Sequence, residues 1–220
     1  MVLTWSIYRL APVAVLACSV SALQPPTTHE VTGERGVVIL SPEPHDPRVA
    51  LTREAIAFWN RILGDLELLP RFRETALIVS SADLRAFENY TRRLWQQAGR
   101  LPPGFSGPAP PPELLQLHSD VVVLLSKQEI MSFAWPLESS TRFFVAISVD
   151  SGSPSNHLPT LRNVIAHELG HTLGLVHNGV ATALMCGPCR VPLMELDSAK
   201  RFLSLTLQDR ELLRKLYSGP

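Results

Sequence analysis

The sequence predicts a mixed α/β or α+β domain whose sheet is mainly parallel and backed by helices. Segments with the apolar patterns of strands and helices alternate along the chain, which is typical of this class. The continuous apolar run VVVLL over 121–125 indicates a strand covered on both faces. The chain has 220 residues, of which 45% are hydrophobic and 18% charged, so it suits one such domain with appendages.

The N-terminal half is expected to hold strands alternating with two helices. The segment 36–40, GVVIL, is rich in β-branched residues and predicts the first strand. Pro47 can open a helix, because the first helical turn lacks N–H partners anyway, and Gly64 can end it. The segment 66–79 contains two short strand candidates, and 82–97 has the apolar spacing of a second helix.

Prolines mark the middle of the chain. The segment 101–112 contains six prolines and two glycines, which excludes a helix or a central strand, and we expect an exposed loop there. Two further strands are expected over 121–125 and 142–150. A helix is then expected from about 160 to 173, after a turn-rich link.

The C-terminal segment, 206–217, has leucines along one side of a helix. Thr206 and Asp209 have the spacing of a capping pair, in which two side chains bond the first backbone N–H groups of a helix. We therefore expect the domain to end in a capped helix.

The first 22 residues have the pattern of a secretory signal peptide. Their one charge, Arg9, precedes the apolar run Leu10–Leu23, whose 14 residues are fewer than the roughly 20 that a transmembrane helix needs. Val20-Ser21-Ala22 offers small residues to a signal peptidase, whereas Val15-Leu16-Ala17-Cys18 resembles a bacterial lipoprotein box that would be lipidated on Cys18. A buried N-terminal helix is the remaining alternative.

These features divide the chain into a signal segment, 1–22, a polar tether, 23–35, and one domain, 36–220. A secreted or periplasmic protein is expected, with a lipid anchor on Cys18 as its one route to a membrane. Twenty Lys and Arg balance twenty Asp and Glu, so no basic surface for nucleic acid is indicated. We expect a monomer.

The residues that indicate a chemistry lie over 167–177, HELGHTLGLVH. His167 and His171 are four residues apart, so on a helix their imidazoles share one face and can bind one zinc ion. Glu168 lies about 100° around the helix, beside that face. Gly174 can turn the chain through a left-handed conformation and return His177 as a third ligand.

Three protein ligands leave one position of a zinc ion open, as in catalytic zinc sites. Zinc lowers the pKa of bound water from about 15.7 to about 7. Glu168 is then the expected general base, which takes a proton from the activated water and passes it to the leaving amine. The remaining histidines have no partner at ligand spacing: His29, His45, His118 and His157.

This motif resembles that of the metzincin zinc endopeptidases, which combine it with a downstream methionine turn. Ala183-Leu184-Met185 matches that turn, and its spacing from His177 is most similar to the matrixin branch. The resemblance implies a metzincin fold, and it implies that Met185 forms an apolar floor under the histidines without binding zinc. It also implies that the strand around 143–149 lies near the cleft, and that an edge strand pairs with an extended substrate.

The sequence departs from the family pattern after Met185. Gly187 stands where the tyrosine-ligand branches, astacins and serralysins, have Tyr, so these branches fit less well. Cys186-Gly187-Pro188-Cys189 also has the residues of a thioredoxin-type redox motif. A local disulfide between Cys186 and Cys189 is the preferred interpretation; a redox role, free thiols and a metal site remain as alternatives.

The hypothesis is an exported zinc metalloendopeptidase that acts on peptides or proteins. His167, His171 and His177 are its expected zinc ligands, and Glu168 is its acid and base. The alternatives are a non-catalytic zinc-binding module and a thiol–disulfide oxidoreductase.

Overall fold

The computed structural model describes six stretches of the chain, which are residues 33–80, 84–97, 107–137, 141–148, 158–187 and 202–218. The predicted signal segment, Cys18 and Cys189 lie outside these residues. No helix in the described stretches is long and apolar enough to cross a membrane.

A five-stranded sheet forms the centre of the domain, in the order β2-β1-β3-β5-β4. Four strands are parallel: β1 (Arg35–Ser41), β2 (Phe72–Val79), β3 (Val121–Leu125) and β5 (Phe143–Ile147). β4 (Phe133–Pro136) is an edge strand and pairs antiparallel with β5. The prediction of a mixed, mainly parallel sheet is confirmed.

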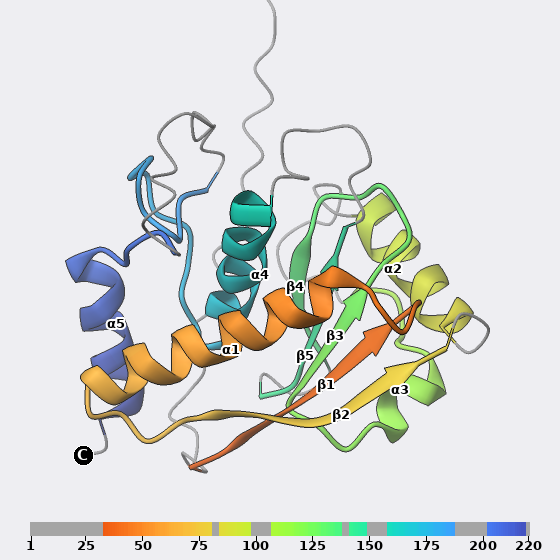
Figure 1. Ribbon diagram of the computed structural model, residues 1–220, viewed down its shortest axis with the longest axis horizontal. Coiled ribbons are helices and arrows are strands. Elements are labelled where there is room, and N and C mark those ends of the chain that lie inside the picture. Colours follow the sequence, from red (N-terminus) through yellow and green to blue (C-terminus); the bar gives the residue numbers. More distant parts are fainter. Residues whose placement is uncertain are drawn as a thin grey trace, which may run out of the picture.

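Helices cover both faces of this sheet (Figure 1). α1 (Pro47–Asp65) and α4 (Leu158–Thr172) pack on one face, and α2 (Arg85–Gln97) and the short α3 (Pro112–Gln116) pack on the other. α5 (Leu207–Tyr217) lies beyond α1 and α4. All five residues of β3 are fully buried, and their side chains alternate between the two cores, as predicted for a strand covered on both faces.

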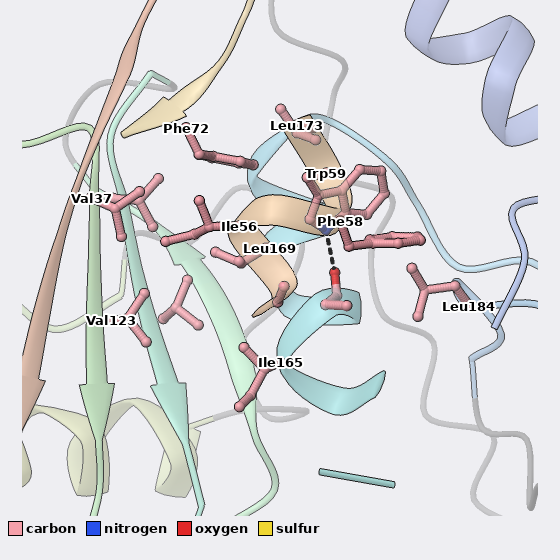
Figure 2. Close-up of a cluster of buried hydrophobic side chains, with 14 of the residues drawn as sticks. Val37, Ile56, Phe58, Trp59, Phe72, Val123, Ile165, Leu169, Leu173 and Leu184 are labelled. Carbon is pink, nitrogen blue, oxygen red and sulfur yellow. Dashed lines mark hydrogen bonds between the residues drawn. The ribbon is translucent and has the colours of Figure 1, made fainter. Parts of the chain in front are cut away.

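The core between α1, α4 and the sheet fixes the position of α4 (Figure 2). Trp59 is fully buried, and its indole N–H donates a 2.8 Å hydrogen bond to the carbonyl of Ala166 in α4. Phe58 contacts the Trp59 ring edge-on and stacks on Phe202. The Trp59–Ala166 bond joins α1 to the helix that carries the histidine motif, and the Phe58–Phe202 stack joins α1 to the segment before α5.

Three elements differ from the expectations. The segment 66–79 contains one strand, β2, where two were expected. Its first residues form a turn, in which Glu67 has a positive φ of 57° and the side chains of Leu66 and Leu68 are buried. β4 was not expected, since it has four residues and ends in a proline that only an edge strand tolerates. α3 starts at Pro112, the last residue of the predicted loop, because proline suits the first helical turn.

The other helix and strand predictions agree with the structure to within a few residues where it describes them. The capping pair at the start of α5 is present in both directions: the Asp209 N–H donates to the Thr206 hydroxyl, and the Thr206 N–H donates to the Asp209 carboxylate. The division of the chain at 22 and 35 stays a prediction.

Candidate metal centre

α4 presents two of the predicted ligands on one face. His167 and His171 lie one turn apart, and their Nε2 atoms are 3.0 Å from one another. The next residue after His167, Glu168, lies on an adjacent side of the same helix. α4 therefore positions two imidazoles and one carboxyl group as the motif predicts.

A glycine turn ends α4 and returns the third histidine. Gly174 has a φ of 86°, in the left-handed region. The Gly174 N–H donates to the carbonyl of His171 (2.9 Å), and the Leu175 N–H donates to that of Gly170 (3.2 Å), which is the bonding pattern of a Schellman helix end. The chain then places the Nε2 atom of His177 3.0 Å from that of His167 and 3.1 Å from that of His171.

The three Nε2 atoms fit a zinc ion in distance and in chemistry. A tetrahedral centre with Zn–N bonds of about 2.0–2.1 Å needs nitrogens roughly 3.3 Å apart, close to the separations found here. The Nδ1 atoms of His167 and His171 lie 2.7 and 2.8 Å from the carbonyls of Leu184 and Leu175. A carbonyl can only accept, so both Nδ1 atoms carry the proton and both Nε2 atoms keep a lone pair for a metal.

Burial keeps these imidazoles neutral. Desolvation lowers the pKa of His171 from 6.5 to about 3, with a further lowering by His167. The pKa values of His167 and His177 are also lowered, in both cases mainly by burial. Neutral imidazole is the form that binds a metal, so the site is prepared for one at neutral pH.

Glu168 is buried beside the histidines. Its side chain is almost inaccessible to solvent, and burial raises the pKa of the carboxyl group to about 8. The backbone N–H of Ala134, in edge strand β4, donates a hydrogen bond that opposes this shift. The carboxyl group is therefore held between the metal-binding face of α4 and the edge of the sheet.

Met185 lies in the turn that follows the third histidine. It is fully buried, and a Cβ added to Gly170 would lie 2.6 Å from its sulfur, so α4 approaches the methionine closely because this position is a glycine. The carbonyl of the preceding residue, Leu184, bonds the imidazole of His167. Its role as a floor stays a prediction from the family resemblance.

Within the described residues, these three histidines form the one group of His, Cys, Asp or Glu side chains suited to a metal. His45 and His118 are exposed and belong to no such group, and His29 and His157 lie outside the described residues. Cys186 is in a disulfide bond. The pairing with Cys189 stays a prediction.

The expectation that the strand over 143–149 lies near the cleft stays a prediction; β5 lies inside the sheet, directly beside the edge strand β4. The backbone donor of Ala134 was not predicted, because it belongs to a strand that the sequence did not reveal. The bond between Asn178 and Asp209, described below, was also missed, although the capping pattern had already marked Asp209.

Comparison with known proteins agrees with this geometry. Residues 114–218, just under half of the chain, match the matrixin (peptidase M10) family. This match supports the resemblance drawn from the motif, and together with the three-histidine group it supports a zinc metallopeptidase. No curated protein matches the chain.

Two solved structures are similar at low identity. Archaemetzincin from Methanopyrus kandleri is 16% identical, with a TM-score of 0.46, over 84% of this chain and 96% of its own. A chain from a structure described as a chaperone–substrate complex is 15% identical, with a TM-score of 0.44, over 78% of this chain and 29% of its own.

Proposed function

From the matrixin match, we propose that this protein is an exported zinc endopeptidase that uses Glu168 as its general base. The proposal rests mainly on three imidazole nitrogens, 3.0–3.1 Å apart, beside the buried carboxyl group of Glu168 on the helix that carries two of them. Three protein ligands would leave one zinc position open to water and substrate, which separates a catalytic site from a structural one.

Zinc held by these histidines would acidify water and polarise the carbonyl of a peptide bond. The protein itself moves the proton. Burial raises the pKa of Glu168 to about 8, so its carboxyl group binds a proton far more readily than a solvated glutamate. Glu168 would take the proton of the attacking water and give it to the leaving amine.

The edge strand offers a place for the substrate backbone. β4 pairs with β5 along one side, and no strand of the described sheet pairs with its other side. An extended peptide could add to that side by main-chain hydrogen bonds. The bond from Ala134 to Glu168 would then place the substrate backbone next to the proton-transferring group.

Export is proposed from the sequence of residues 1–22, with cleavage after Ala22 or lipidation at Cys18. Mass spectrometry of the mature N-terminus distinguishes the two. A protein that keeps Met1 when it is expressed in its native host would contradict both forms of processing.

The thiol–disulfide alternative has less support. A reactive cysteine of that class lies at a helix N-terminus, which stabilises its thiolate. Cys186 instead follows Met185 in a turn, outside any helix of the described stretches.

Substitution of Glu168 by Gln tests the proposal directly. The zinc-loaded wild type should cleave a mixed peptide library, and Glu168→Gln should keep its zinc while its kcat falls by roughly 100- to 10,000-fold. Retained activity in the variant would contradict the role of Glu168. Bound zinc without cleavage by the wild type would favour a non-catalytic zinc module.

A further inference from the structure

The three histidines are held in different ways. His167 and His171 are fixed twice, by the helix and by a carbonyl at each Nδ1 atom. His177 is more exposed, and within the described residues its imidazole bonds no carbonyl and no carboxylate. The position of this ligand therefore depends on the backbone that carries it.

That backbone is fixed by the methionine turn. The Asn178 N–H donates to the carbonyl of Met185 (2.8 Å), and the Gly187 N–H donates to the carbonyl of Asn178 (3.0 Å). Gly187 also lies against the His177 ring, since an added Cβ would be 2.3 Å from its Cγ. The turn thus contacts His177 from one side without a side-chain hydrogen bond.

α5 holds both ends of the segment that carries His177, which lies between α4 and α5 in Figure 1. At its start, the hydroxyl of Tyr217 donates to the carbonyl of Leu173 (3.2 Å). At its end, the amide of Asn178 donates to both carboxylate oxygens of Asp209 (3.1 and 3.3 Å). The side-chain oxygen of Asn178 accepts from the N–H of Val180, so this side chain is bonded through both of its polar atoms.

Asp209 is a firm anchor for this contact. It is buried, and its Oδ2 atom also accepts from the backbone N–H of Thr206. Asp209 and Thr206 together cap α5, so the Asp209 carboxylate cannot move without breaking the cap. Asn178 is joined directly to His177 in the chain, and its displacement would move that ligand.

We propose that Asn178 and Asp209 are positioning residues for the third zinc ligand, through which α5 sets the affinity of the site for zinc. This inference rests on the zinc site of the proposed function. It predicts that breaking the bond between Asn178 and Asp209 lowers the affinity for zinc, beyond any effect on the stability of the zinc-free protein. A pair that merely fastens α5 would change stability and leave zinc affinity unaltered.

An exchange of the two side chains tests the pair. Asn178→Asp sets two carboxylates against each other, whereas the double variant N178D/D209N restores the bond with donor and acceptor reversed. The oxygens that accept from Val180 and Thr206 are kept in the double variant. Asn60→Asp is the matched control, because Asn60 makes a comparable pair of bonds to the backbone of Phe72, in β2.

Zinc affinity is measured on full-length protein by competition with a chelating dye, with the visible spectrum of the cobalt form as a second readout. Unfolding of zinc-free protein in urea gives the stability of each variant. We expect N178D to lose roughly 10- to 100-fold in zinc affinity, as for other groups that orient metal ligands. The double variant should regain most of this loss, and Asn60→Asp should lose stability alone. An added negative charge near zinc would by itself raise the affinity, so a fall reports displaced geometry.

Unchanged zinc affinity in N178D would overturn the inference. A loss of zinc affinity in Asn60→Asp equal to that in N178D would also overturn it. A loss that the double variant fails to recover would also overturn it. Failure of the wild type to bind zinc is a different result, because it would contradict the proposed function itself.

Discussion

At the scale of the residue, burial gives opposite shifts to neighbouring groups of the candidate site. The imidazoles lose their charged form, and the pKa of His171 falls from 6.5 to about 3. Glu168 loses its charged form as well, so its pKa rises from 4.5 to about 8. Both groups are uncharged near neutral pH before a metal binds, which avoids the cost of unpaired buried charges.

The stability of the metal-free protein should therefore be highest near pH 6.5. Between 6.5 and about 8 the folded chain holds a proton on Glu168 that the unfolded chain releases, so stability falls as the pH rises. Below 6.5 the unfolded chain protonates His171 and the folded chain does not, so stability falls as the pH decreases towards about 3. The pKa values of His167 and His177 are lowered as well, so these residues add to the loss of stability at acid pH, which the raised pKa of Glu168 opposes.

Urea unfolding of chelator-treated protein at several pH values measures this profile. Glu168→Gln should remove the alkaline decline and leave the acid decline in place. A stability that rises steadily from pH 6.5 to pH 8 in the wild type would contradict the assignment.

Gly170 is a second residue whose identity is set by its contacts. A methyl group there would lie 2.6 Å from the sulfur of Met185 and 2.9 Å from the ring of Trp59. Gly170→Ala should lower the free energy of unfolding by about 1–3 kcal/mol, because buried overpacking forces its neighbours apart. Gly179, whose added Cβ would meet nothing within 4 Å, is the control, and Gly179→Ala should change stability little. Equal effects of the two variants would contradict the packing argument.

At the scale of the element, a buried ion pair joins α1 to the sheet. Arg48 is 5% exposed and pairs with Asp46, the N-cap residue of α1, at 2.6 Å. Its guanidinium group also donates to the carbonyls of Leu125, Ser126 and Ile147, at the carboxyl ends of β3 and β5. One side chain thus bonds the start of a helix and the ends of two strands.

Arg48→Met should destabilise the protein by about 3–5 kcal/mol, since it leaves a buried carboxylate without its partner. Arg73→Met is the control, because Arg73 pairs with Glu34 on the surface and such pairs contribute about 0–1 kcal/mol. Chemical denaturation of both variants measures the difference. A loss in Arg48→Met no larger than in Arg73→Met would show that the buried pair is dispensable.

Long apolar elements and the histidine motif could be predicted from the sequence because their signals are local. β3, α1 and α5 each carry a pattern of burial or capping within one segment. β4 could not be predicted, since its four residues gain their strand conformation by pairing with β5. The bonds that complete the site, from Ala134 to Glu168 and from Asn178 to Asp209, join segments far apart in the chain.

In the molecule as a whole, we expect the core to form without zinc. Two buried clusters, one on each face of the sheet, hold the described elements together. Zinc removal by a chelator should therefore leave the circular dichroism spectrum of a folded protein and lower the Tm. A ligand present at 100 times its Kd adds about 2.7 kcal/mol of stability. Loss of secondary structure on chelation would contradict this independence.

Catalysis by this protein requires that three histidines hold zinc and that one position of the ion stays open. X-ray absorption at the zinc edge, on zinc-loaded wild type, measures the ligands of the ion. We expect one zinc per chain with three imidazole nitrogens at about 2.0–2.1 Å, completed by an oxygen ligand. A sulfur ligand at about 2.3 Å, or a fourth ligand from the protein, would contradict it, because the site would then be closed.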